Sequence, residues 1–170
     1  MSKSKIEWTE STWNPVTGCS KISEGCDNCY AERMAKRLKA MGQKNYINGF
    51  EVACHPHMLD APLKWKKSNM VFVNSMGDLF HEKVPLDFIR QVFGVMNIAD
   101  QHFYQVLTKR AKRLLELSEM IKWDSHIWMG VTVENKTFKY RIEYLRKAPA
   151  KTKFLSLEPL LGSLGELNLS

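Results

Sequence analysis

Strand-like and helix-like segments alternate through most of the sequence after residue 30. Apolar residues at helical spacing predict helices at 30–41, 85–100, 110–122 and 135–147. The β-rich apolar runs between them predict strands within 70–80, 103–109, 126–134 and 152–161. Strands that alternate with helices of this length are typical of βαβ units with a parallel sheet. Since 170 residues can bury a hydrophobic core, the sequence predicts one α/β domain over 1–170.

Local signals mark several boundaries of these elements. Gly42 follows the first helix as a C-cap, Pro85 suits the first turn of the second, and Asn135 is an N-cap for the fourth. The alternation is interrupted at about 42–69, where no long periodic segment is present. We therefore expect an irregular insertion there, within the same domain.

Polar residues follow the apolar part of each predicted strand. They are, in chain order, Asn74, Ser75 and Asp78, then Thr108 and Lys109, then Thr132 and Glu134, and finally Ser156 and Glu158. A chain that leaves a sheet for water would also place polar residues at these points. Ligands of parallel α/β folds, however, bind at the carboxyl ends of the strands. The two matched Ser/Thr-x-Glu endings, together with the acidic residue of the first strand, favour a binding site at this edge.

Three of the four cysteines lie in one short loop, GCSKISEGCDNCYAE. Cys26 and Cys29 have the C-x2-C spacing of metal sites, and Cys19 precedes Cys26 by a gap of six residues. Gly18 and Gly25 give the loop the freedom to bring the three thiols together. Three cysteines suit a [4Fe-4S] cluster that keeps one iron open for a substrate or cofactor.

Two other interpretations of these cysteines remain open. Cys54, His55 or His57 in the insertion could supply a fourth ligand, which would complete a structural zinc site. The thiols could also be unrelated buried side chains, and Cys54 alone is most simply a small buried hydrophobic residue.

The composition bears on partners and compartment. The formal net charge of +7 favours polyanions, so nucleic acid is a candidate partner. No apolar run is long enough for a membrane span, and the N-terminus carries no visible secretory signal. We therefore expect a cytoplasmic protein, where clustered cysteines more often bind metal than form disulfides. The alternative function is a zinc-stabilised, basic nucleic-acid-binding module without catalysis.

Five motifs in order resemble those of the phage-associated, radical-SAM-like protein family. They are TWNPVTGCSKISEGCDNCYAERMAKR, VFVNSMGDLFHEKVP, FYQVLTKR, MGVTVEN and FLSLEPLLG. The resemblance covers nearly the whole chain. It implies a partial (β/α) barrel of the radical SAM type, here with about five parallel strands and a truncated C-terminal part.

The resemblance also implies cofactors and a reaction. A [4Fe-4S] cluster held by three cysteines would bind S-adenosylmethionine at its open iron. One-electron reduction, from a reductant of the flavodoxin or ferredoxin type, would cleave the sulfonium to methionine and a 5′-deoxyadenosyl radical that abstracts hydrogen from a substrate. Neither the substrate nor a catalytic residue is identified by the resemblance.

Site residues follow from the same resemblance. Cys19, Cys26 and Cys29 would be the cluster ligands, and Lys109 or Arg110 would pair with the methionine carboxylate. The other cofactor contacts would be Tyr30 beside the adenosyl group, the methionine-binding segment Ser75, Met76, Gly77 and Asp78, and the interior residues Glu134, Ser156 and Glu158.

Three features of the sequence differ from the superfamily pattern. The gap between Cys19 and Cys26 is six residues where three are usual, and Asn28 stands where an aromatic residue is often found. The chain also ends at Ser170, before a further strand with a glycine-rich motif. We therefore expect an open sheet edge that another polypeptide or an oligomer could complete.

Overall fold

A five-stranded parallel sheet forms the centre of the molecule. The computed structural model describes residue 4 and residues 6–169. The strands lie in the order β1–β4–β5–β6–β7, and every neighbouring pair is parallel. Their bounds are β1 Ser11–Trp13, β4 Met70–Val73, β5 Phe103–Thr108, β6 Ile127–Thr132 and β7 Thr152–Ser156. The predicted α/β class with about five parallel strands is confirmed.

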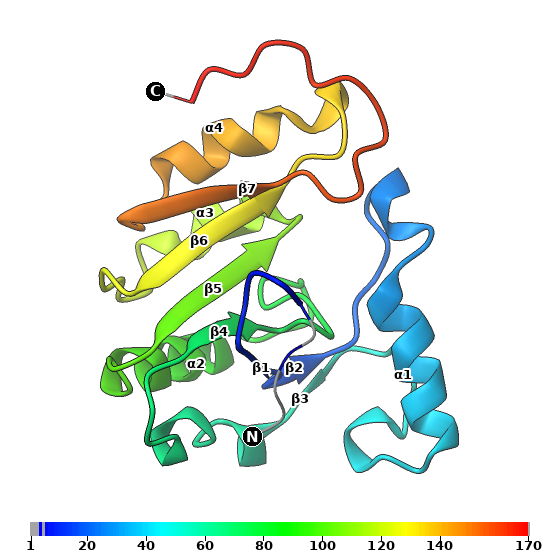
Figure 1. Cartoon of the computed structure of the whole chain (residues 1–170), viewed down its shortest axis with the longest axis vertical. Helices are drawn as coiled ribbons and strands as arrows, with labels where there is room; N and C mark the ends of the chain where they lie inside the picture. Colours follow the sequence, from blue (N-terminus) through cyan, green and yellow to red (C-terminus); the bar gives the residue numbers. More distant parts are fainter. Residues whose placement is uncertain (1–3, 5, 170) are drawn as a thin grey trace.

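Helices connect the strands and cover the sheet. They are α2 (Leu86–Ile98) between β4 and β5, α3 (Ala111–Ser118) between β5 and β6, and α4 (Tyr140–Lys147) between β6 and β7. In Figure 1, α2 and α3 lie behind the sheet, and α4, which packs against α3, runs along β6 and β7. The remaining helix, α1 (Tyr30–Ala40), lies apart from these three, beyond the carboxyl ends of the strands. In the part of the chain that the structure describes, no helix has the length and apolar character to cross a membrane.

The core lies between the sheet and its helices, because alternate strand residues face the helices. The buried strand residues are Val71, Val73, Tyr104, Val106, Ile127, Met129 and Val131. The helices contribute apolar side chains at helical spacing, including Ile89, Val92, Phe93, Met96, Leu114 and Leu145. The intervening strand residues, such as Phe72, Leu107 and Trp128, are only partly buried on the opposite face. There the Trp8 ring, which comes from the N-terminal segment, contacts the Phe72 ring at 4.7 Å between centroids.

The segment between β1 and β4 has little regular structure apart from α1. A short antiparallel pair joins β2 (Val16–Thr17) to β3 (Ala53–Cys54). Single turns of 3-10 helix occupy Glu24–Cys26, Lys44–Tyr46, Pro56–Met58 and Pro62–Lys64. The connection from β2 to α1 is the cysteine loop (residues 18–29), and Figure 1 shows it at the carboxyl ends of the strands.

The predicted capping residues are found at Gly42 and Asn135, whereas the bounds of the last helix and the last strand differ from the prediction. Gly42 has a φ of 70°, which suits the expected C-cap of α1. The side chain of Asn135 accepts a hydrogen bond from the Thr137 N–H at 2.9 Å, as an N-cap does. It caps a single 3-10 turn at Lys136–Phe138, so the predicted helix 135–147 divides into that turn and α4. The last predicted strand ends at Ser156, three residues before Pro159.

Candidate functional site

A cavity of about 510 Å³ opens at the carboxyl ends of the parallel strands. Its wall includes all three loop cysteines together with polar residues from four strand ends. The polar residues are Asn74, Ser75, Asp78, Thr108, Lys109, Arg110, Thr132, Ser156 and Glu158. A second cavity, of about 480 Å³, is also lined by Cys19, Cys26 and Cys29. The cysteine loop is thus a wall that the two cavities share.

The three thiols come from different local structures. Cys19 follows β2, Cys26 ends a 3-10 turn, and Cys29 directly precedes α1. All three are free and half-buried. The first-turn N–H groups of α1 favour negative charge near Cys29. The Sγ of Cys26 lies 3.7 Å from the Oγ of Ser23.

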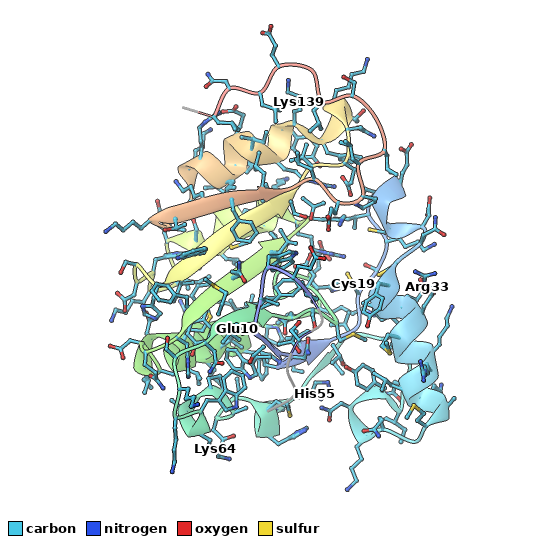
Figure 2. The ribbon with its side chains drawn as sticks, viewed as in Figure 1. Glu10, Cys19, Arg33, His55, Lys64 and Lys139 are labelled. Carbon is cyan, nitrogen blue, oxygen red and sulfur yellow. The ribbon has the colours of Figure 1, made fainter. Side chains whose placement is uncertain are left out.

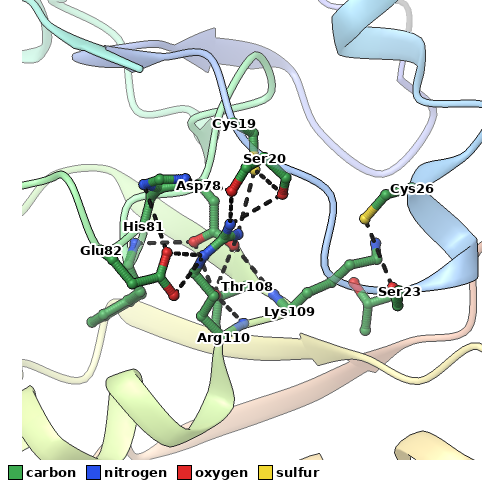
Figure 3. Close-up of polar contacts among 12 residues, drawn as sticks. Cys19, Ser20, Ser23, Cys26, Asp78, His81, Glu82, Thr108, Lys109 and Arg110 are labelled. Carbon is green, nitrogen blue, oxygen red and sulfur yellow. Dashed lines mark hydrogen bonds and ion pairs between the residues drawn. The ribbon is translucent and has the colours of Figure 1, made fainter. Parts of the chain in front are cut away.

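The guanidinium of Arg110 lies beside the thiol of Cys19 and forms the centre of a hydrogen-bond network, drawn in Figure 3. Its Nη1 donates to Cys19 Sγ at 3.3 Å and to Asp78 Oδ2 at 3.1 Å. Its Nε donates to the carboxylate of Glu82 at 3.0 Å, and its Nη2 to the carbonyl and hydroxyl oxygens of Ser20 at 3.1 and 3.0 Å. All five N–H groups of the guanidinium therefore have partners within the protein, and Arg110 has no free donor for a ligand.

Burial raises the pKa of the Cys19 thiol to about 11, and the charge of Asp78 adds to this effect. Arg110 opposes it through its charge and its hydrogen bond. Without metal the thiol is therefore protonated near neutral pH. Iron binding at Cys19 would have to displace that proton.

Asp78 joins the ends of β4 and β5 beneath this thiol. Its carboxylate accepts hydrogen bonds from the hydroxyl of Thr108 at 2.8 Å and from the N–H of Phe80 at 2.9 Å, besides the bond from Arg110.

The buried ring of His81 also contacts Ser20. The Lys83 N–H donates to Nδ1 of His81, so Nε2 carries the proton and donates to Ser20 Oγ at 2.8 Å. Burial lowers the pKa of His81 and keeps the ring neutral. These contacts fix Ser20, the residue after Cys19.

A second buried network holds the part of the cysteine loop between Cys19 and Cys26. Glu134 has no exposed surface and pairs with Nη1 of Arg141 at 2.8 Å. It also accepts a hydrogen bond from Ser23 Oγ at 2.6 Å, and Nζ of Lys109 lies 3.8 Å away. The long gap between the first two cysteines is thus attached to the end of β6.

Gly18 and Gly25 are required because other atoms pack directly against their backbone, more than because they make the loop flexible. A Cβ on Gly25 would lie 2.5 Å from Oε1 of Glu134. A Cβ on Gly18 would lie 2.1 Å from the carbonyl oxygen of Glu51, and Gly18 has a φ of 81°. The expectation of a freely adaptable loop is therefore replaced by a tightly packed one.

The structure brings most of the predicted site residues to the first cavity. Its lining includes Tyr30, Ser75, Gly77, Asp78, Lys109, Ser156 and Glu158, as well as the three cysteines. Met76 and Glu134 do not line it. Met76 packs in the core, and its N–H donates to the side chain of Asn14 at 2.9 Å. Glu134, two residues after the end of β6, is fully covered by its contacts with Ser23 and Arg141 and so exposes no surface to the cavity.

The additional ligands considered for zinc lie elsewhere. Cys54 is in β3 opposite Val16, and His55 Nε2 lies 2.8 Å from Thr17 Oγ1. The ring of His57 lies 5.7 Å from that of His55. None of the three histidine or cysteine side chains of this segment lines either cavity. Figure 2 shows His55 apart from Cys19.

Three residues that organise the site are not evident from the motifs. Ser23 and Arg141 hold Glu134, and the side chain of Asn14 accepts hydrogen bonds from Ser75 and Met76 after β4. Only Arg141 has a sequence signal. It lies four residues before buried Leu145, where an apolar residue is expected on a packed helix face.

Comparison with known proteins gives one match. No curated protein and no solved structure matches the chain significantly. The model of one family, described as "Protein of unknown function (DUF5131)", matches residues 3–170. Because that match covers nearly the whole chain, the protein belongs to the DUF5131 family.

Proposed function

We propose that the protein binds a [4Fe-4S] cluster through Cys19, Cys26 and Cys29 and acts with S-adenosylmethionine as a radical enzyme. The observation that carries the proposal is the place of the three free thiols, on the wall of a cavity at the carboxyl ends of a parallel sheet. This is the edge at which parallel α/β folds bind ligands. Three thiolates would leave one iron of the cluster for a non-protein ligand.

The possible fourth ligands of a zinc site lie away from the three thiols. A four-ligand zinc site would need one of them beside Cys19, Cys26 and Cys29. The segment with Cys54 and His55 is engaged in the β2–β3 pair and does not extend to the cavity. These observations favour the cluster over the zinc alternative.

The rest of the first cavity offers groups that suit S-adenosylmethionine. Lys109 can pair with the carboxylate of the methionine moiety, and since Arg110 has no N–H left, Lys109 is the better of the two candidates. Ser156 and Glu158 can hydrogen-bond to hydroxyl or amino groups, and Tyr30 can lie beside the adenine. When bound and reduced, the cluster would supply the electron that cleaves the sulfonium. The protein's part is to hold the cofactor against the open iron and exclude water.

The remaining partners follow from this assignment. A small electron carrier of the flavodoxin or ferredoxin type would deliver the electron. The net charge of +7 makes nucleic acid a candidate substrate. The five parallel strands would form part of a radical SAM barrel, and β7, which pairs only with β6 among the described strands, would be the edge that another polypeptide or a second copy completes.

Anaerobic reconstitution with iron and sulfide tests the proposal. We expect about four irons and four sulfides per chain, and an electron paramagnetic resonance spectrum of the reduced protein that changes when S-adenosylmethionine is added. Cys26→Ala should lose most of the iron. Cys54→Ala is the matched control, because it removes a half-buried cysteine that does not line the cavity, and it should keep the wild-type iron content.

Two results would contradict the proposal. One is a colourless protein that retains one tightly bound zinc and loses it in Cys54→Ala, which would support the four-ligand alternative. The other is a cluster whose spectrum is unchanged by S-adenosylmethionine. Under the zinc-module alternative, the protein would bind DNA or RNA with an affinity that falls steeply with added salt.

A further inference from the structure

Arg110 is the only described residue whose charged side chain donates a hydrogen bond to one of the three loop thiols. The bond runs from Nη1 to Cys19 Sγ at 3.3 Å, and Arg110 is 5 % exposed. Cys26 has the Ser23 hydroxyl as its neighbour, and Cys29 lies at the start of α1. Cys19 therefore differs from the other two cysteines in its electrostatic surroundings.

The position of this guanidinium is fixed from both ends. The Arg110 N–H donates to the hydroxyl of Thr108 at 2.9 Å, which holds the backbone at the turn from β5 to α3. At the far end Asp78, Glu82 and Ser20 take the remaining N–H groups. A buried arginine with every N–H paired has no low-cost alternative conformation. It is therefore a fixed donor aimed at Cys19, not a mobile group that swings toward a substrate.

A hydrogen bond or a positive charge beside a cysteine ligand stabilises the reduced, more negative state of an iron–sulfur cluster. We propose that Arg110 is a positioning residue that holds Cys19 as a cluster ligand and raises the reduction potential of the cluster. This inference rests on the proposed function, since it requires a cluster at the three cysteines. Its consequence is that an electron carrier of the flavodoxin or ferredoxin class can donate the single electron more easily than it could to a cluster without this contact.

The test is a potentiometric titration of the reconstituted protein, followed by electron paramagnetic resonance, with no activity measurement. Arg110→Gln removes the charge and the bond to Cys19, and its midpoint potential should be more negative than that of the wild type. Since Arg110→Gln leaves Asp78 buried without its partner, the double variant Asp78→Asn/Arg110→Gln removes both charges. The double variant should shift the potential in the same direction as Arg110→Gln but by less, because the loss of the negative charge of Asp78 acts in the opposite sense.

Arg113→Gln is the matched control. Arg113 lies in α3 one turn further on and donates to the carbonyl of Val84 at 2.9 Å, without contact to a cysteine. Its loss removes one positive charge about one turn away from Arg110, and the potential should stay at the wild-type value. Arg110→Lys keeps the charge but not the fork of donors, and its potential should lie between those of Arg110→Gln and the wild type.

Wild-type potentials in Arg110→Gln and in the double variant, at wild-type iron content, would overturn the inference while leaving the cluster itself established. An Arg113→Gln shift as large as that of Arg110→Gln would also overturn it, since the effect would then be one of general charge. If both charge-removing variants lose the cluster, a wild-type potential in loaded Arg110→Lys would overturn it as well. Absence of a cluster from the wild type would instead overturn the proposed function.

Discussion

Two buried arginine–carboxylate pairs hold the cysteine loop, and they differ in what they contact. Arg110 and Asp78 lie beside the thiol of Cys19, and this pair shares its guanidinium with the exposed carboxylate of Glu82. Arg141 and Glu134 are sealed from solvent and hold the segment between the first two cysteines. The first pair acts on a candidate ligand, whereas the second fixes the shape of the loop. Stability and cluster properties should therefore respond differently to changes in the two pairs.

The largest expected effect on stability is at Glu134. Glu134→Gln would leave the charge of Arg141 buried without its partner, which should lower the free energy of unfolding by about 3–5 kcal/mol. Urea denaturation followed by circular dichroism measures this change. Asp60→Asn removes the carboxylate of an exposed pair with Lys64 and should change the stability very little, because solvent and salt screen such a pair. Equal losses in the two variants would show that burial of the Glu134 pair has no special importance.

A smaller loss is expected at the other pair. Arg110→Gln should lower the free energy of unfolding by about 3 kcal/mol, because Asp78 keeps its bonds from Thr108 and Phe80 when the guanidinium is lost. Asp78→Asn and the double variant complete a double-mutant cycle. We expect the double variant to lose less than the two single variants together. Strict additivity would mean that Arg110 and Asp78 do not stabilise each other.

Substitution of Gly25 tests the contact between the loop and Glu134. The new Cβ of Gly25→Ala would collide with a carboxylate that has no room to move, and we expect a loss of about 2 kcal/mol. Gly94→Ala is the opposite case. Gly94 lies within α2 with no atom in reach of a Cβ, so alanine should stabilise the protein by about 1 kcal/mol. A stabilising effect at both glycines would contradict the packed loop described above.

The smallest of these effects is expected at Ser23. Ser23→Ala removes one hydrogen bond to a charged group, which should cost about 1.5 kcal/mol in urea denaturation. Ser163→Ala is the control, because its hydroxyl accepts from the N–H of Gly165 in an exposed turn and its loss should change little. The iron content of reconstituted Ser23→Ala should stay near the wild-type value. A large loss of iron would assign this serine to the cluster rather than to the loop.

The parallel sheet could be predicted from the sequence because its evidence is local. Val71 and Val73 alternate with less buried residues, and the apolar residues of α2 recur at helical spacing, so each element carries its own pattern. The order of the elements then gives parallel strands and a common edge of carboxyl ends. Ser156 and Lys109 line the same cavity because both stand at this edge of the sheet.

The roles of individual polar residues could not be predicted in the same way. Glu134 and Glu158 have similar sequence surroundings, yet one is sealed against Arg141 and the other lines the cavity. Arg110 and Lys109 are adjacent basic residues, yet only Arg110 is committed to Asp78 and Cys19. These differences depend on hydrogen-bond partners elsewhere in the chain. Arg141 lies 7 positions from Glu134, and Cys19 lies 91 positions from Arg110, so no local pattern predicts the pairs.

The α/β class, the parallel strands and the three thiols of one loop are predictable from the sequence alone, because periodicity and spacing are local properties of the chain. Which carboxylate pairs with which arginine, and why Gly25 must be a glycine, depend on contacts between distant segments. The tertiary structure also separates Cys54 from the cavity and places Arg110 against Cys19. The physical reason is that buried charges must find partners, and the nearest partner is set by how distant segments pack and not by their order in the chain.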